Sequence, residues 1–314
     1  PRIGNVQTGG NARIIAALED VSDLAPGMVV TADLAGVGTY LQASTRITGL
    51  NIALSGQGTI TGNIAIDQNA AAGATGATLT FTEQHRNLNL TGTNTGNNTF
   101  SPQLVDSVAG KVGVNKSGPG TWVLTNDNHT YTGGTTVNAG LLATLKLRNN
   151  GPTTINGGTL KTANGLAVAD PAGTSVFPEG QFTIAGGATP AGKLDLSKGG
   201  AVFDYATVSP EATIAALLDS GYGTGNWGGN GITSADAAAN PSTHGVGYAE
   251  ASAVGSPATF LGQSVDGTAV LVRYTRQGDA NLDGTTGIGD FSLLGANFNQ
   301  AGKWSSGDFN YDGT

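Results

Sequence analysis

Short segments in which apolar and polar residues alternate recur from about residue 31 to residue 205, and Gly, Asn or Thr separates them. A period of two residues is typical of a β-strand with one buried face. Strands this short are not stable in isolation, so each needs neighbours to pair with. The pattern predicts strands at 46–54, 58–66, 77–81, 88–90, 120–124, 134–137, 153–155, 158–160 and 181–184.

The way such strands bury their apolar side chains decides the fold class. If they stack in rungs, the inward Ile, Leu and Val side chains form one continuous narrow core. Outward Thr then suits an exposed sheet face, and Gly or Asn supplies the left-handed turn conformations. We therefore predict a mainly β chain with a right-handed parallel β-solenoid (β-helix) over 31–205. A β-sandwich is the alternative, because it is also built from many short strands.

Composition narrows the classes of protein further. Gly makes up 51 of 314 residues and charged residues only 11%, which disfavours a helix bundle or a doubly wound α/β enzyme. The net charge of 14 − 22 = −8 argues against nucleic acid as a partner, because phosphate binding needs a basic surface. The absence of Cys excludes disulfides, thiolate metal sites and Cys nucleophiles. No apolar run reaches about 18 residues, so we predict no membrane span.

One stretch, residues 110–142, reads GKVGVNKSGPGTWVLTNDNHTYTGGTTVNAGLL. It resembles the autotransporter-associated β-strand repeat, and residues 151–165 resemble a degenerate further rung. The matching positions are Lys116, Gly118, Gly120, Thr121, Leu124, Asn128, Tyr131, Gly133, Gly134, Thr135, Val137, Gly140 and Leu141. The resemblance implies a β-helical stalk of a secreted or surface protein, with no chemistry of its own.

The segments that flank the predicted solenoid differ from it. In residues 1–30, taken as an N-terminal cap or connector, we predict a short helix capped by Asn11, with Ile14, Ile15 and Leu18 on one face and Pro26 beyond its end.

Residues 206–276 form a predicted mixed connecting module. Ser209 and Pro210 open a helix with Ile214, Leu217 and Leu218 on its apolar face, and a last strand is predicted at 268–274. The sequences of this module are similar to the C-terminal module of large secreted proteins of planctomycete-type bacteria.

The acidic tail, residues 277–314, carries the best candidate site. Oxygen-bearing residues stand at positions 1, 3, 5, 7 and 12 of a loop, and Gly284 occupies position 6, where the chain must turn sharply. Hard cations of the size of Ca²⁺ need several oxygen ligands of this kind and an acid that closes the loop. We predict structural Ca²⁺ held by Asp279, Asn281, Asp283, Thr285 through its carbonyl, and Asp290.

This loop resembles the dockerin-type half EF-hand, although position 12 is Asp and not Glu. A helix is predicted at 290–299 with Phe291, Leu294 and Phe298 on one side. A second, incomplete loop begins at Asp308, Asn310 and Asp312. It is either truncated or completed by a neighbouring subunit. The resemblance implies docking to a cohesin-like partner as one use of this tail.

The sequence offers no convincing enzyme site, so we predict that the chain is not an enzyme. His85, His129 and His244 are far apart, and the acids of the predicted solenoid are scattered between turns. Hydrolysis of glycosidic bonds needs two carboxyl groups about 5–10 Å apart.

We predict an extracellular structural protein, secreted or on the cell surface, that self-assembles as a filament or surface-layer subunit stabilised by calcium. The open edge strands of a solenoid favour pairing with another copy, and contacts that do not close a ring give fibres. The alternative is a cell-surface adhesin or scaffold module that binds a cohesin-like partner or a surface glycan. A polysaccharide-active β-helix enzyme is a weaker alternative.

Overall fold

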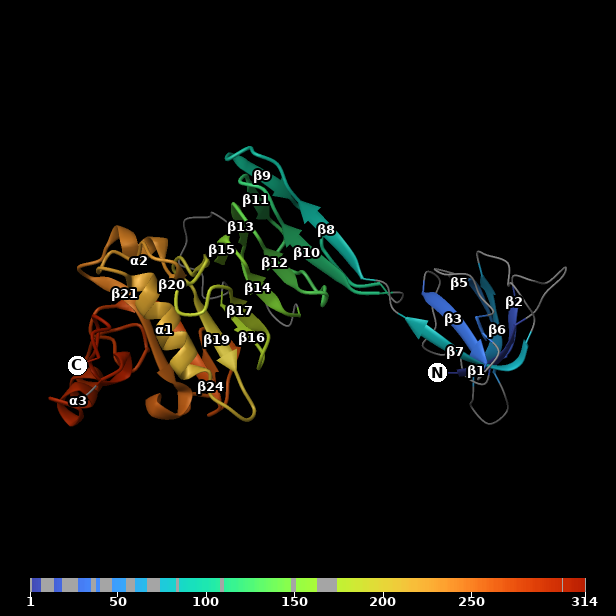
Figure 1. The fold of residues 1–314 in the computed structure, drawn as a ribbon. Helices are drawn as coiled ribbons and strands as arrows, with labels where there is room; N and C mark the ends of the chain where they lie inside the picture. Colours follow the sequence, from blue (N-terminus) through green and yellow to red (C-terminus); the bar gives the residue numbers. More distant parts are fainter. Residues whose placement is uncertain are drawn as a thin grey trace. The chain divides into compact units, whose positions relative to one another are not determined.

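The chain divides into two compact units in the computed structural model (Figure 1). The first unit comprises 1–86 with 106–112, and the second comprises 87–105 with 113–314. Within them the structure describes residues 2–6, 14–18, 28–34, 38–39, 47–54, 60–66, 74–82, 85–107, 110–147, 151–162, 174–300 and 302–313. The boundaries of the four predicted segments, 1–30, 31–205, 206–276 and 277–314, stay predictions.

The first unit is one seven-stranded sheet with the order β4-β3-β7-β1-β2-β6-β5. Each of its neighbouring strands pairs antiparallel. Its strands are β1 (Arg2–Val6), β2 (Ile14–Leu18), β3 (Val29–Leu34), β4 (Gly38–Thr39), β5 (Ile47–Leu54), β6 (Ile60–Ile66) and β7 (Ala74–Thr82).

The helix predicted near the N-terminus is wrong for the described residues. Ile14–Leu18 is strand β2, and Ile15 pairs with Ile64 of β6. Consecutive Ile residues favour a strand because their branched side chains are stiff and fit a pleated surface. The cap residue Asn11 and the Pro26 beyond the predicted end lie outside the described residues.

The strands predicted at 46–54, 58–66 and 77–81 are present as β5, β6 and β7, but they are not parallel rungs. β5 and β6 form an antiparallel pair in which Leu54 lies opposite Ile60. A connection of a few residues can join antiparallel strands, whereas a parallel pair needs a long crossover. The solenoid predicted from residue 31 is therefore wrong for the described strands before residue 83.

The second unit begins with two sheets whose strands alternate along the chain from β8 to β15, so that each of these rungs gives one strand to each sheet. One sheet contains β8 (Arg86–Leu90), β10 (Val112–Lys116), β12 (Thr135–Val137), β14 (Thr153–Ile155) and β17 (Phe182–Ile184). The other contains β9 (Asn97–Phe100), β11 (Thr121–Leu124), β13 (Leu141–Thr144), β15 (Gly158–Thr162), β18 (Gly192–Asp195) and β20 (Gly231–Thr233).

Pairing is parallel from β10 to β17 in the first of these sheets and from β9 to β20 in the second. This confirms a mainly β fold with parallel sheets, as in a β-helix, and it differs from the antiparallel sheets of a β-sandwich. Identical or similar side chains stack from rung to rung in the core. In one column Leu142, Leu160, Leu194 and Ile232 lie in register, and all four are fully buried.

Two polar features also connect neighbouring rungs. Lys116 is fully buried, and its ammonium donates hydrogen bonds to the carbonyls of Ser117 (3.2 Å), Gly118 (2.7 Å) and Ala139 (2.9 Å). These bonds link the turn after β10 to the turn after β12. Burial lowers the pKa of this amine.

An asparagine ladder runs along the outside of the sheet that contains β10. The side-chain amide of Asn115 donates to Asn89 (3.1 Å), that of Asn138 donates to Asn115 (2.8 Å), and that of Asn156 donates to Asn138 (2.9 Å). Each bond joins neighbouring rungs, so the ladder fixes the spacing of rungs that are otherwise held by the backbone.

After the rungs the chain forms a mixed module. Its sheet has the order β16-β19-β24-β21, with β16 (Ser175–Phe177), β19 (Gly200–Asp204), β24 (Ala269–Arg276) and β21 (His244–Glu250). The remaining elements are α1 (Glu211–Tyr222), α2 (Ala235–Ala239), η3 (Ala251–Val254), β22 (Thr259–Phe260), β23 (Gln263–Ser264), α3 (Ile288–Ala296) and η4 (Trp304–Ser306).

The helix predicted after Ser209 is confirmed as α1. The Ser209 hydroxyl accepts a hydrogen bond from the backbone N–H of Glu211 (3.0 Å), and Ile214, Leu217 and Leu218 are buried. The helix lies against β20, the last strand of its sheet, so it covers that edge. The approach is close, because a Cβ on Gly221 would stand 1.9 Å from the carbonyl oxygen of Ile232.

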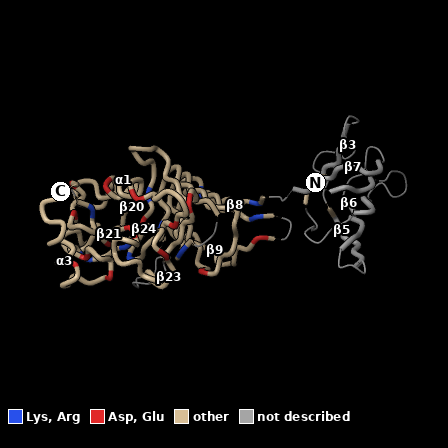
Figure 2. Tube along the Cα trace, turned by 90° about the horizontal axis from the view of Figure 1, so that it is seen from below, with Lys and Arg blue, Asp and Glu red and all other residues tan. Residues whose placement is uncertain are grey.

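No helix in the described part of the chain is long and apolar enough to cross a membrane. Charged residues are sparse along the second unit, where most of the trace belongs to other residue types (Figure 2). The predicted strand at 268–274 is confirmed as β24.

Candidate metal centre

The first predicted calcium loop connects β24 to α3, and its side chains are ordered by the loop's own backbone. Asp279 accepts hydrogen bonds from the N–H groups of Asp283 (3.0 Å) and Gly284 (2.9 Å) and from the Thr275 hydroxyl. The side-chain amide oxygen Oδ1 of Asn281 accepts from the N–H of Asp283 (2.9 Å). The acids and the amide at positions 1, 3 and 5 therefore share one turn of chain.

Asp290 bonds back to the loop through both of its carboxylate oxygens. Its two oxygens accept from the N–H of Asn281 (3.0 Å) and from the N–H of Gly287 (2.7 Å), so it ties position 3 to the start of α3. Asp283 is held in turn by the N–H and the hydroxyl of Thr285, at 2.8 and 2.7 Å.

Burial and the positive charge of Arg273 set the electrostatics of the loop. Asp279 is fully buried, which raises the pKa of its carboxyl group, while the hydrogen bond from the Thr285 hydroxyl lowers the pKa of Asp283. The Arg273 guanidinium attracts both acids and donates to the carbonyl of Leu282 (2.8 Å). Two carboxyl groups, those of Asp279 and Asp283, interact with this one guanidinium.

The donor set of this loop fits a hard cation, because it consists of carboxylate, amide and carbonyl oxygens. Across the described residues, no group of three or more His, Cys, Asp or Glu side chains is arranged to hold a metal ion. The predicted site therefore needs Asn281 and the carbonyl of Thr285 as well as the acids.

The second loop repeats the geometry of the first. Asp308 accepts from the N–H groups of Asp312 (3.1 Å) and Gly313 (3.0 Å), as Asp279 does from Asp283 and Gly284. Asn310 accepts from the N–H of Asp312 (3.3 Å), as Asn281 does in the first loop.

The backbone conformation at position 4 is also the same in the two loops. Leu282 and Tyr311 both adopt the left-handed conformation with φ of 60°. The two DxNxDG segments are therefore the same turn formed twice.

Trp304 fastens both loops to the body of the module. It is fully buried, and its indole N–H donates to the carbonyl of Asp279 (2.7 Å). Its ring lies over Gly245 and Gly247 of β21, where a Cβ on Gly247 would stand 2.4 Å from the indole nitrogen. Only glycine leaves room for this ring at that position.

Tyr311 anchors the second loop. Its ring centroid lies 5.4 Å from that of Tyr222, 5.7 Å from Trp227 and 6.0 Å from Tyr248, and its hydroxyl donates to the carbonyl of Val246. The pattern of acids does not reveal this anchoring. The one indication in the sequence is a large aromatic residue at position 4, where the calcium loop needs no side chain.

The predicted helix after the first loop is present as α3, which begins at Ile288. Ile288, Phe291 and Leu294 of α3 are exposed, and so is Phe298, which lies beyond the end of the helix at Ala296 and not on it as predicted. This apolar face is therefore turned to solvent, whereas the loops beside it are packed against β21.

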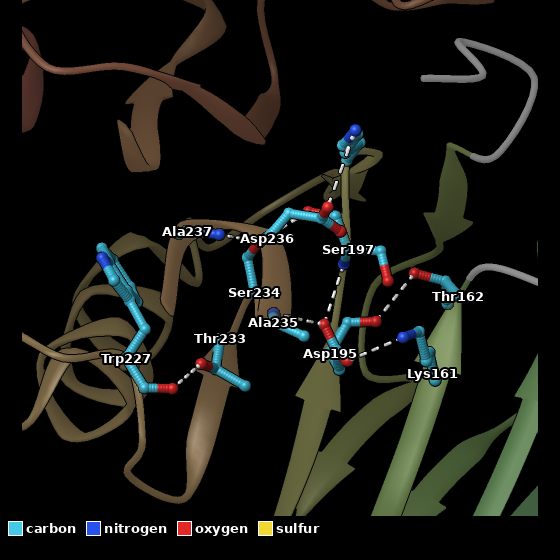
Figure 3. A network of polar contacts seen from close by, with 11 residues as sticks. Lys161, Thr162, Asp195, Ser197, Trp227, Thr233, Ser234, Ala235, Asp236 and Ala237 are labelled. Atoms are coloured by element: carbon cyan, nitrogen blue, oxygen red, sulfur yellow. Dashed lines mark hydrogen bonds and ion pairs between the residues drawn. The ribbon is translucent and has the colours of Figure 1, made fainter. Parts of the chain in front are cut away.

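A second polar cluster was not predicted (Figure 3). Asp195, at the end of β18, accepts from the N–H groups of Ser197 and Ala235, both at 2.9 Å, and lies 3.6 Å from the Lys161 ammonium. The Ser234 hydroxyl caps α2 by accepting from the N–H of Ala237 (3.0 Å) and donates to the carbonyl of Ser197 (2.6 Å). These bonds join the last rungs to the C-terminal module. An isolated Asp after a buried strand gives too little pattern to predict them.

Comparison with known protein families identifies a repeat in the rungs. Residues 114–143 and 144–161 match the family described as Passenger-associated-transport-repeat (PATR). The chain carries an autotransporter-associated repeat. The match covers β10 to β15, and it confirms the resemblance predicted for 110–142.

The chain is also 35% identical, over 158 residues, to the protein named Adhesin BmaC autotransporter of Brucella suis biovar 1 (strain 1330). The aligned part is 48% of this chain but only 4% of that relative. No solved structure matches the chain. The dockerin-type and planctomycete-type resemblances stay predictions.

Proposed function

We propose that this chain is a segment of a cell-surface or secreted adhesin-like protein, in which the parallel rungs act as a rigid stalk. The observation that carries this proposal is the PATR match, which falls on the rungs built by β10 to β15. The relative that shares 35% identity is named as an autotransporter adhesin. A stack of rungs with few charges and a continuous core suits a stalk, because each rung is stabilised only by its neighbours.

A structural and binding role also agrees with the polar clusters of the described residues. In the Asp195 cluster the hydrogen bonds run to backbone N–H groups that close turns and cap a helix. A nucleophile paired with a base and an oxyanion site would be the mark of an acyl-transfer enzyme. We therefore propose a non-enzymatic protein.

We propose further that Ca²⁺ stabilises the C-terminal module through Asp279, Asn281, Asp283, Thr285 and Asp290. The ion would neutralise carboxylates that otherwise repel one another around a buried Asp279. Because Trp304 donates to Asp279 and packs on β21, ordering of the loop would be transmitted to the module. Asp308, Asn310 and Asp312 would offer the first three oxygens of a second, weaker site.

Self-assembly into a filament is a second candidate, favoured by the edges of the rung stack. β8 and β9 are the end strands of their sheets among the described residues. Unpaired strand edges favour addition of a strand from another molecule. Docking to a cohesin-like partner is a third candidate, with the exposed apolar face of α3 as its only support.

Display of the chain on a non-adherent cell tests the proposal. We expect displayed chains to increase attachment to glycan-coated or host-cell surfaces several-fold over cells that display an unrelated stalk. Electron microscopy of the purified chain separates the alternatives, because filaments with no gain in attachment would overturn the adhesin proposal in favour of self-assembly.

Removal of calcium tests the metal proposal. We expect chelation to lower the melting temperature of the second unit, and excess Ca²⁺ to restore it. Asp283→Asn should weaken Ca²⁺ binding measured by calorimetry, whereas Asp266→Asn, which alters an exposed acid outside the loops, should not. An identical melting curve with and without chelator would contradict the proposal.

A further inference from the structure

An open cavity of about 670 Å³ lies between α1 and the strands β16, β17 and β19. Its lining is mostly apolar, and Phe177, Ile184, Phe203, Ile214 and Leu217 are buried. The side formed by α1 carries small exposed residues, among them Ala212 and Ala216. Sites for small molecules are typically mostly apolar clefts of about 300–1,000 Å³ with a few polar groups, and this cavity meets that description.

Three aromatic rings line one wall of the cavity. The centroids of Phe177 and Phe182 are 4.8 Å apart, those of Phe182 and Phe203 are 5.1 Å apart, and those of Phe177 and Phe203 are 5.3 Å apart. The three residues come from β16, β17 and β19, so the wall is held by three strands. Rings held in this way present both faces and edges to an apolar or aromatic ligand.

The charged residues of the lining have one sign. Glu179 and Asp204 are acidic, and none of the described residues that line the cavity is Lys, Arg or His. Glu179 is fixed in place, because its oxygens accept hydrogen bonds from the N–H of Ala206 (2.9 Å) and the hydroxyl of Thr207 (2.7 Å).

The environment of Asp204 adds to this excess of negative charge. The pKa of Asp204 is raised by partial burial and by the nearby charges of Asp266 and Glu179. These groups repel one another, and a cation bound among them would relieve that repulsion.

We propose that this cavity binds a small organic amine, with its apolar body against the phenylalanine wall and its ammonium group facing Asp204 and Glu179. An ammonium near aromatic rings gains further attraction from the ring quadrupoles. The site lies apart from the candidate metal loops and requires neither calcium nor adhesion, so it goes beyond the proposed function.

Two probes with the same body and opposite heads test the charge requirement. We expect the full chain to bind 4-phenylbutylamine, followed by ligand-observed NMR, at least about 5-fold more tightly than 4-phenylbutanoate. Asp204→Asn should reduce amine binding several-fold and leave the carboxylate probe unchanged or slightly tighter. Equal binding of the two probes, or no detectable binding of the amine, would overturn the proposal.

A filled-cavity variant tests the location. Ala216→Trp places a large ring from α1 into the cavity, and we expect it to abolish amine binding. Ala238→Trp makes the same change at an exposed alanine of α2 outside the cavity and should bind normally. Both variants are checked by thermal unfolding, so that a loss of fold is distinguished from a filled site. Retention of amine binding by folded Ala216→Trp would overturn the proposal.

Discussion

The strands of the two units are similar in residue type, yet they pair antiparallel in the first unit and parallel in the rungs of the second. Both use short alternating segments separated by Gly, Asn and Thr. In the first unit β5 pairs with the next strand, β6, as an antiparallel neighbour. In the second unit β11 pairs in parallel with β9 and β13, two strands away in the sequence on either side. Alternation thus specifies strands but leaves their partners open.

Three features of the second unit favour the parallel arrangement. Like side chains stack in columns, the asparagine ladder links neighbouring rungs, and Lys116 links two turns through backbone carbonyls. The columns and the ladder place the same kind of residue at the same point of consecutive turns, and the bonds of Lys116 join two consecutive turns. Removing them one at a time measures what each contributes to the difference between the units.

The largest effect is expected from Lys116→Met. The change keeps an apolar stem but leaves three partly buried carbonyls without the ammonium that donates to them, and we expect about 2–4 kcal/mol of lost stability. Denaturant unfolding followed by tryptophan fluorescence reports on the second unit, which holds Trp122, Trp227 and Trp304. Lys198→Met, at an exposed lysine, is the control. A loss below that of the control would mean that Lys116 does not hold the rungs together.

Gly247→Ala should have the next largest effect. The added Cβ would stand 2.4 Å from the indole nitrogen of Trp304, so the ring must move away from β21. We expect about 1–3 kcal/mol of lost stability, typical of overpacking a filled site, together with a change in fluorescence. Gly267→Ala, where the nearest atom to the new Cβ is 3.5 Å away, should be near neutral. Equal effects of the two changes would contradict the anchoring of the tail by Trp304.

Asn138→Ala interrupts the asparagine ladder at its middle. It removes the donor to Asn115 and the acceptor for Asn156, and we expect about 0.5–1.5 kcal/mol of lost stability because these bonds are exposed. Hydrogen exchange followed by mass spectrometry should show faster exchange in peptides from β10 to β15 and no change in peptides from β5 and β6. Asn97→Ala, at an exposed asparagine outside the ladder, is the control. Faster exchange in both units would show that the ladder is not what distinguishes them.

The smallest effect on stability is expected from lowering the pH. Burial lowers the pKa of His129, whose Nδ1 accepts from the N–H of Leu104 (3.0 Å), so the folded chain binds a proton on this ring less readily than the unfolded chain does. The unfolded chain takes up the proton near pH 6.5 and the folded chain only at lower pH, so stability falls as the pH drops below about 6.5. Melting temperatures at pH 7.5 and 5.5 measure this loss, and His129→Gln should reduce it. His244, whose pKa burial also lowers, acts in the same direction, so His244→Gln is measured beside it.

Some of the fold and of the candidate site could be predicted because neighbouring residues encode it. The helix after Ser209 and the repeat around Lys116 depend on spacing within a few residues, and both are confirmed. The acids of the tail loops likewise lie in turns that their own backbone N–H groups order. The helix predicted over Ile14–Leu18 failed because β2 forms through its pairing with β1 and with β6, and β6 lies about fifty residues away.

By itself the sequence determined the strand segments, the repeat and the positions of the oxygen-bearing side chains, because period, turn residues and loop spacing are local properties. Only the tertiary structure decided which strands pair in parallel, why Gly247 must remain glycine, and that Trp304 and Tyr311 bind the tail to the module. These outcomes depend on contacts between distant residues, whose energies exceed the weak preferences of single segments.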